Sequence, residues 1–176
     1  HVAEILEQEG ANIIYAVRSQ KRHTELLALK PSAEVVVCDF EKEQDISSLR
    51  SYLESMESNS IHGVLHSIAF ANYSEGLKPF HDTNVKDYLQ ATQISSFSLV
   101  ELANACKPAL QKDASLVTIG ISSINVTAEN YGYMAPIKAS LEANVRYLAK
   151  SFSSFSSVRF NSVNAGPLKT SASAGI

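Results

Sequence analysis

Tyr131, Met134 and Lys138 are spaced at i, i+3 and i+7, which places side chains on one face of an α-helix. A phenol and an ammonium on one face could converge on a single ligand. When a hydride adds to an enone or a ketone, negative charge develops on oxygen, and a phenol that donates a hydrogen bond stabilises that charge. A nearby ammonium favours ionisation of the phenol and can also bind hydroxyl groups. Spacing alone, however, is more typical of a tyrosine at the edge of a core and a lysine whose stem packs along the helix.

The elements that would position this pair alternate between strand and helix along the chain. Apolar side chains in the same segment form a stripe that should pack the helix on a sheet and leave Tyr131 and Lys138 at its border. Short apolar runs predict strands at 13–17, 34–37, 63–66, 115–119 and 158–163. Helical patterns occupy 2–9, 22–30, 44–57, 84–110 and 130–153. Because strand and helix alternate, we expect an α/β fold, a Rossmann-type doubly wound parallel sheet with helices on both faces.

The beginning of the chain departs from the usual form of such a sheet. Open α/β sheets normally start with a strand and a glycine-rich turn that binds a pyrophosphate at a helix N-terminus. Here the seven glycines are scattered, and the chain opens in an amphipathic helix that Gly10 should end. We therefore expect the first strand and the glycine-rich loop to be missing from this chain. Residues 1–176 are interpreted as one dinucleotide-binding domain, incomplete at both ends.

Composition excludes several other classes of protein. With 45% hydrophobic residues the chain can bury a substantial core, and a formal net charge of −3 argues against binding nucleic acid or an anionic membrane. No apolar run is long enough to cross a bilayer, and no signal peptide is recognisable. Cys38 and Cys106 lack metal-ligand spacing and fit the reducing cytosol. We expect a cytoplasmic protein without a metal site.

The residues around Tyr131 and Lys138 resemble a known family. Residues 131–148 read YGYMAPIKASLEANVRYL, which resembles the signature of the enoyl-acyl-carrier-protein reductases, a divergent branch of the short-chain dehydrogenase/reductase superfamily. That family uses Tyr-x6-Lys, whereas classical members of the superfamily place the tyrosine where this chain has Met134. Tyr133 fits neither spacing. The resemblance continues through HSIAFA at 66–71, QISSFS at 93–98, NAGPLKT at 164–170 and AGI at 174–176. Several motifs in the right order favour the catalytic interpretation of Tyr131 and Lys138.

The resemblance also implies which positions bind the dinucleotide cofactor. Asp39 resembles the carboxylate that accepts the adenine amino group, with Phe40 beside the ring; local hydrogen bonding at a strand end is the alternative. Ser67 and Ile68, directly after the strand that ends at His66, match positions that contact the cofactor. His66 itself is interpreted as a structural residue. The loop after the last strand matches the segment that contacts the nicotinamide and the pyrophosphate. The implied cofactor-binding residues are Arg18, Asp39, Phe40, Ser67, Ile68, Lys138, Gly166, Pro167, Leu168 and Thr170.

Arg18 suggests which nicotinamide cofactor is used. It follows the strand at 13–17, where doubly wound folds distinguish the adenosine 2′-substituents. An acidic residue there favours a free hydroxyl, whereas arginine can bind a 2′-phosphate. We therefore expect NADPH, with NADH as the alternative, although basic residues also open many solvated helices.

The substrate positions depend on the resemblance alone. Those that match the family's acyl pocket are Ala69, Ala71, Ile121, Met134, Ala172 and Ile176. Ile121 is a departure, because the family commonly has a tyrosine there. Lys169 likewise replaces a common arginine. Small apolar side chains suit an acyl chain but are also ordinary core residues.

The leading interpretation is an NAD(P)H-dependent enoyl-acyl-carrier-protein reductase of fatty acid synthesis. Its partner would be an acyl-carrier protein bearing an enoyl thioester. A carbonyl or 3-ketoacyl reductase is an alternative in which Ser122 or Ser123 would help Tyr131 activate a ketone. A non-catalytic NADP(H)-binding paralogue is a third. The long helical patterns resemble those with which related enzymes form tetramers, so we expect a homo-oligomer.

Overall fold

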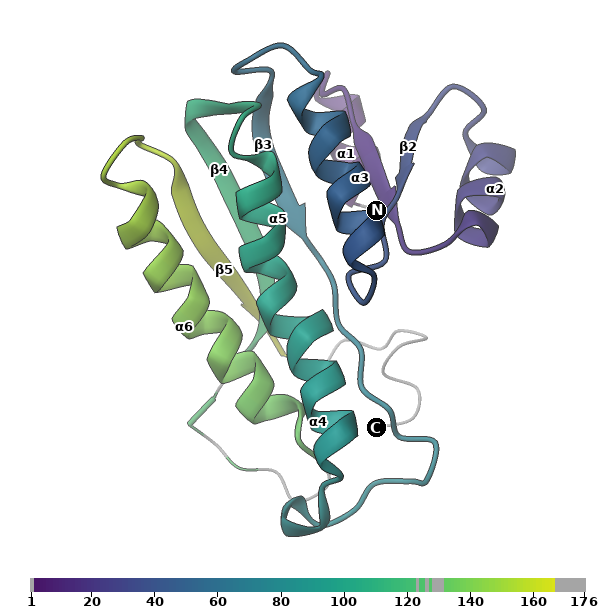
Figure 1. Cartoon of the computed structure of the whole chain (residues 1–176), viewed down its shortest axis with the longest axis vertical. Coiled ribbons are helices and arrows are strands. Elements are labelled where there is room, and N and C mark those ends of the chain that lie inside the picture. The colour runs from purple at the N-terminus through teal and green to yellow at the C-terminus, as the bar shows by residue number, and fades with distance from the viewer. Residues whose placement is uncertain (1, 123, 126, 128–131, 167–176) are drawn as a thin grey trace. The chain divides into compact units, whose positions relative to one another are not determined.

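The computed structural model describes residues 2–122, 124–125, 127 and 132–166. The chain divides into two compact units, His1–Tyr52 and Leu53–Ile176, and each holds a parallel sheet. The parallel strands and the alternation with helices confirm the predicted fold class (Figure 1). Within the described part of the chain, no helix combines the length and apolar character needed to cross a bilayer.

The first unit pairs two short strands. After α1 (Val2–Gln8), Gly10 has φ = 89°, a conformation that glycine adopts without strain, and the helix ends there as expected. β1 (Ile14–Val17) pairs in parallel with β2 (Glu34–Val37), and α2 (Gln20–Leu29) connects them. α3 (Glu43–Glu54) follows. These elements lie within a few residues of their predicted positions.

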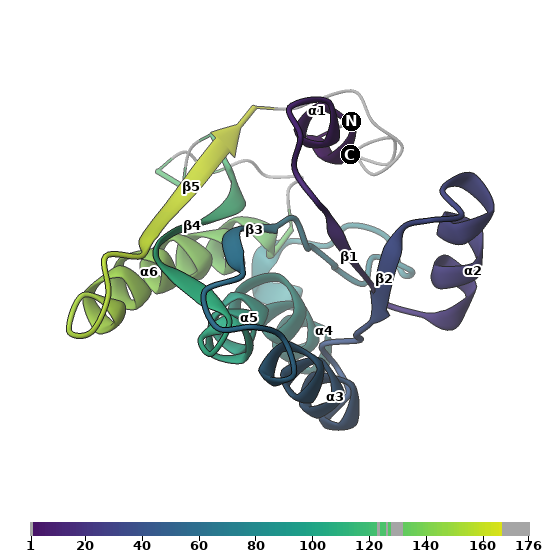
Figure 2. The same cartoon turned by 90° about the horizontal axis from the view of Figure 1, so that it is seen from above.

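The second unit is a three-stranded parallel sheet in the order β3, β4, β5. β3 (Ile61–His66) and β5 (Arg159–Ala165) flank β4 (Leu110–Ile121), which is longer than predicted. Two helices, α5 (Ser98–Cys106) and α6 (Met134–Phe152), lie on the same side of this sheet in Figure 2. The apolar stripe of α6 is buried as predicted, through Ile137, Leu141, Val145, Leu148 and Phe152.

The predicted helix at 84–110 is interrupted. It consists of α4 (Val85–Thr92), a π-helical turn (Gln93–Phe97) and α5. Ser95 and Ser96 lie in the π-turn with exposed fractions of 0%, and their hydroxyl groups bond to partners outside this helix. A π-turn inside a helix often marks a functional site, because the extra residue redirects side chains. No proline or glycine lies between Val85 and Cys106, so the pattern predicted one continuous helix there. The predicted end at 110 was wrong, because α5 ends at Cys106, two residues before Pro108, and Leu110 begins β4.

Candidate active site

The parallel strands of the second unit bring their carboxyl ends to one edge of the sheet. Ser67 follows β3, Ser122 follows β4 and Gly166 follows β5. The register pairs His66 with Thr118 and Ile121 with Ala165, so these ends lie close together. Ligands of open α/β sheets bind outside this edge. An active site is therefore expected at this edge of the sheet.

His66, the last residue of β3, is a buried structural residue, as the sequence analysis suggested. Its ring is 1% exposed, with Nδ1 2.8 Å from Thr118 Oγ1 and Nε2 2.8 Å from Ser98 Oγ. Ser98 Oγ donates to the carbonyl of Ile94 at 2.6 Å, so Nε2 donates to Ser98. In a neutral ring Nδ1 is then the acceptor, and Thr118 Oγ1 donates to it rather than to the more distant carbonyl of His66 at 3.3 Å. Burial lowers the pKa of His66 from 6.5 to about 4, with the Lys138 charge as a smaller cause. The imidazole is neutral.

This neutral histidine predicts an acid-sensitive fold. The pKa of His66 is lower in the folded protein than in the unfolded chain, so between pH 6.5 and 4 the unfolded chain binds a proton that the folded protein does not. The free energy of unfolding is therefore highest above pH 6.5 and falls as the pH drops towards 4. At about 1.4 kcal/mol per pKa unit, the free energy of unfolding should fall by about 3 kcal/mol over that range. Urea titrations of wild type and His66→Gln at several pH values test this. An equally steep loss in the variant would contradict it.

Lys138 is more deeply buried than its predicted position at the edge of the apolar stripe implied. It is 5% exposed, and its Nζ donates to the carbonyl oxygen of Ile119 at 2.8 Å. This contact places the ammonium near the carboxyl end of β4. Burial lowers the pKa of Lys138 from 10.5 to about 8. An ammonium has three N–H donors, so Lys138 can also bind an oxygen of a ligand.

The predicted helical face shared by Tyr131 and Lys138 has no support in the described residues. Helix α6 begins at Met134, and Gly132 has φ = 60°, which is not helical. The predicted helix at 130–153 was therefore too long at its start, and i to i+7 spacing cannot place Tyr131 relative to Lys138. Tyr131 itself lies outside the described residues. Its catalytic role stays a prediction based on the family motif.

Some predicted acyl positions do come together. Ala71 and Met134 pack against a cluster formed by Ala91, Tyr133 and Ile137. Ala69, in the same segment as Ala71, is exposed, and Ile121 is the half-buried last residue of β4. Ala172 and Ile176 lie outside the described residues. Segments that are distant in the sequence therefore contribute to one apolar cluster.

The cofactor positions of the second unit lie at the ends of strands. Ser67 is exposed and Ile68 half-buried, directly after β3. A Cβ added at Gly166 would meet no atom of the described residues within 4 Å. Pro167, Leu168 and Thr170 lie outside the described residues.

The first unit presents Arg18, Asp39 and Phe40 after its two strands. No ion pair of Arg18 is found in the described part of the chain, whereas Lys21 and Arg22 both pair with Glu25 at 4.0 and 3.0 Å.

Asp39 lies in the local turn that was its alternative interpretation. Its Oδ1 accepts from the amide of Glu41 at 3.2 Å, and its Oδ2 lies 3.3 Å from Lys42 Nζ. The ring of Phe40 is buried, at 6% exposed. Adenine contacts by Asp39 and Phe40 stay predictions.

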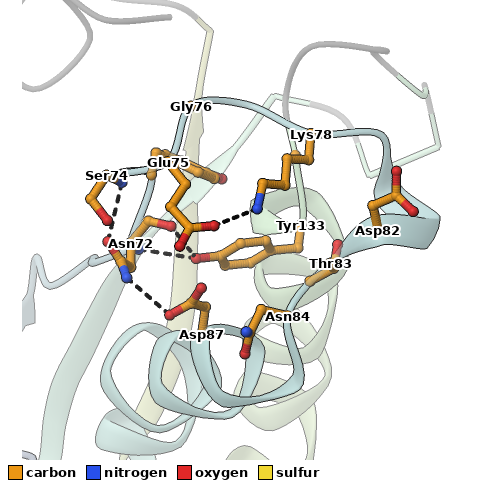
Figure 3. A pocket seen from close by; sticks show the side chains of 12 residues that line it. Asn72, Ser74, Glu75, Gly76, Lys78, Asp82, Thr83, Asn84, Asp87 and Tyr133 are labelled. Atoms are coloured by element: carbon orange, nitrogen blue, oxygen red, sulfur yellow. Dashed lines mark hydrogen bonds and ion pairs between the residues drawn. The ribbon is translucent and has the colours of Figure 1, made fainter.

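Ser95 and Tyr133 were not among the predicted site residues. The phenol of Tyr133 donates to the backbone carbonyl of Asn72 at 3.1 Å and accepts from the backbone N–H of Asn72 at 3.0 Å (Figure 3). Ser95 makes the same pair of bonds with Phe70, at 2.9 and 2.8 Å. Ser95 belongs to a motif of the resemblance, but only the three-dimensional contacts show what its hydroxyl binds.

Comparisons with known proteins agree with this geometry. A family model described as "Enoyl-(Acyl carrier protein) reductase" matches residues 1–176. The chain is 32% identical to the enoyl-(acyl-carrier-protein) reductase (NADPH) FabI of Staphylococcus aureus strain MRSA252, covering 99% of this chain and 70% of the relative. It is 30% identical to the NADH enzyme FabI of Rickettsia typhi, covering 99% and 67%.

A solved structure has the same fold. The enoyl-(acyl-carrier-protein) reductase (NADH) of Aquifex aeolicus VF5 superposes with a TM-score of 0.85 at 31% identity, covering 97% of this chain and 68% of that one. The sequence motifs, the family model and this structure all lead to the same assignment. The chain belongs to the enoyl-(acyl-carrier-protein) reductase family.

Proposed function

We propose that this chain catalyses the NAD(P)H-dependent reduction of the carbon–carbon double bond of an enoyl thioester on acyl-carrier protein, in fatty acid synthesis. The observation that carries the proposal is the buried ammonium of Lys138, at the carboxyl edge of the sheet and seven residues beyond Tyr131 in a chain of this family. A cytoplasmic location is part of the same proposal.

The residues of the chain fit a nicotinamide dinucleotide. In the second unit, Lys138 has N–H donors beyond the one used by Ile119, and a Cβ at Gly166 would meet no atom of the described residues within 4 Å. In the first unit, Arg18 offers an exposed cation after β1. When bound, the reduced nicotinamide supplies the hydride that adds to the β-carbon of the substrate. Lys138 would hold the ribose hydroxyls of the cofactor.

Tyr131 would act on the thioester oxygen. As the double bond is reduced, negative charge develops on that oxygen, and the phenol of Tyr131 would stabilise it by donating a hydrogen bond. A positively charged Lys138 would favour ionisation of this phenol, because an opposite charge nearby lowers the pKa of an acid. Ala71 and Met134 would form part of the apolar wall along the acyl chain.

The direct test measures crotonyl-thioester-dependent oxidation of NADPH and NADH by the full-length protein. We expect turnover of the enoyl substrate and none of acetoacetyl thioester, because the half-buried Ile121 offers no hydroxyl next to β5 to activate a ketone. Turnover of the ketone alone would instead support a carbonyl reductase aided by Ser122 or Ser123. Cofactor binding without turnover of either substrate would support the non-catalytic paralogue.

Arg18 supports NADPH as the preferred cofactor. A guanidinium binds a 2′-phosphate with charge-assisted hydrogen bonds, and these are worth about 1.5 to 3 kcal/mol. Arg18→Gln should therefore raise the KM for NADPH about 10- to 100-fold and leave the KM for NADH unchanged. Lys21→Gln is the matched control, because Lys21 already pairs with Glu25. Equal effects of Arg18→Gln on both cofactors would contradict the assignment.

We also infer that the chain forms a homo-oligomer and that this oligomer is a tetramer. Large apolar side chains are exposed along α4 and the π-turn: Val85 at 72%, Leu89 at 62% and Phe97 at 52%. Their spacing of four and eight residues supports a common side of this helix, which a second copy could cover.

A further inference from the structure

The segment that leaves β3, residues 69–72, is held by hydroxyl groups. We call it the exit segment. Ser95 Oγ accepts from the amide of Phe70 at 2.8 Å and donates to its carbonyl at 2.9 Å. Tyr133 Oη accepts from the amide of Asn72 at 3.0 Å and donates to its carbonyl at 3.1 Å. Each hydroxyl therefore satisfies both backbone polar groups of one residue.

A hydroxyl can replace a neighbouring strand in this way because it has one donor and two acceptor lone pairs. Phe70 and Asn72 are two residues apart, the period at which an extended chain repeats its hydrogen-bonding side. Ser95, in the π-turn, and Tyr133, immediately before α6, thus give the exit segment the backbone partners that a sheet would otherwise supply.

Both hydroxyl groups are themselves firmly placed. Ser95 is completely buried in the π-turn. Tyr133 is 6% exposed, immediately before α6, and its ring packs against Tyr73 and Tyr88 with centroid distances of 5.3 and 6.0 Å. Burial raises the pKa of Tyr133, so its phenol keeps the proton that it donates.

The side chain of Asn72 adds a third connection. Its Nδ2 donates to Asp87 Oδ1 of α4 at 3.0 Å, and its Oδ1 accepts from the amide of Ser74 at 3.2 Å (Figure 3). The exit segment is thereby tied to α4, to the π-turn and to the start of α6.

We propose that Ser95 and Tyr133 are positioning residues that hold the exit segment so that Ala69 and Ala71 form one wall of the enoyl-thioester site. This inference rests on the proposed function. Ala71 and Met134, two positions assigned to the acyl pocket, pack against the cluster that contains Tyr133. Tyr133 is also two residues from Tyr131 in the sequence. A shift of about 1 Å in such a wall can cost about 100-fold in rate, even when the shifted residue does no chemistry.

Two single-atom deletions test the proposal in the full-length protein. Tyr133→Phe and Ser95→Ala each remove one hydroxyl and leave the remaining shape intact. Tyr147→Phe and Ser153→Ala are the matched controls, because Tyr147 is 79% exposed and Ser153 lies on the surface. Thermal unfolding of every variant identifies any that fails to fold.

The first readout is amide hydrogen exchange. In Tyr133→Phe the amide of Asn72 should exchange about 10-fold faster while that of Phe70 stays as in wild type, and Ser95→Ala should show the reverse. Unchanged exchange at both amides in both variants would overturn the proposed bonds. This readout does not depend on enzymatic activity.

The second readout is the affinity for crotonyl-coenzyme A, measured by calorimetry beside the KM for NADPH. We expect the enoyl thioester to bind about 10-fold more weakly in both variants, with the KM for NADPH unchanged. Faster exchange with wild-type substrate affinity would overturn the positioning role. A wild-type protein that neither binds nor reduces crotonyl-coenzyme A would instead contradict the proposed function itself, and that outcome is read from the wild type alone.

Discussion

Replacing Tyr131 by phenylalanine is expected to lower the turnover of crotonyl thioester by about 100- to 1,000-fold, the usual effect of removing one donor to a developing oxyanion. The change deletes a single hydroxyl. Since the phenol would act mainly on charge that develops during hydride transfer, the loss should appear in kcat, with little change in the KM for the cofactor. Steady-state kinetics with varied NADPH separate the two parameters.

Two further variants, Tyr147→Phe and Tyr133→Phe, test whether the loss of turnover is specific to the Tyr131 hydroxyl. The first is the same substitution at an exposed side chain and should be silent. The second removes a phenol that binds the backbone of Asn72 and should weaken binding of the enoyl thioester rather than abolish turnover. If Tyr131→Phe keeps wild-type kcat while Tyr133→Phe loses it, the catalytic phenol has been assigned to the wrong tyrosine.

Replacing Lys138 by methionine is expected to weaken NADPH binding by about 100-fold, because the ribose would lose charge-assisted hydrogen bonds worth about 1.5 to 3 kcal/mol each. The same variant should be as stable as wild type or more so. Burial disfavours the charged ammonium, as its lowered pKa of about 8 indicates, and methionine fills a similar volume without that cost. Fluorescence titration with NADPH and thermal unfolding test both parts. A large loss of stability with unchanged affinity would show that Lys138 is only structural.

The lowered pKa of Lys138 also predicts how affinity depends on pH. Below pH 8 the side chain is an ammonium that can donate to a ligand, and as the pH rises through about 8 it becomes a neutral amine. The affinity for NADPH should therefore fall between pH 7 and 9 in wild type and stay level in Lys138→Met. The free energy of unfolding of the free protein should change in the opposite direction and rise with pH above 8. Between pH 8 and 10.5, Lys138 is protonated in the unfolded chain but neutral in the folded protein.

The strands were the most predictable part of the fold. Short runs of β-branched residues, such as Val35 to Val37, give the same signal in any context, and β2 is observed where it was expected. The buried face of α6 was likewise correct, because its period depends only on the helix. Both features are local, and a single sequence carries them.

The start of α6 and the π-turn were not predictable in the same way. Gly132 adopts φ = 60° with the ring of Tyr73 close to it, so a residue about 60 positions away in the sequence contributes to where the helix begins. In the π-turn, the hydroxyl of Ser95 bonds to the backbone of Phe70 and that of Ser96 bonds to the hydroxyl of Ser140. No local sequence pattern reveals these contacts. The candidate site shows the same division, since motifs located Lys138 but only the structure shows the bonds made by Ser95 and Tyr133.

The most direct test of the proposed reaction follows the hydride itself. Crotonyl thioester is incubated with the full-length protein and NADPH that carries deuterium at the transferable position of C4, and the product is analysed by NMR. The proposed reaction places deuterium on the β-carbon of a butyryl thioester. A butyryl product without deuterium on that carbon, or a crotonyl thioester recovered unchanged while a ketone is reduced, would contradict the account.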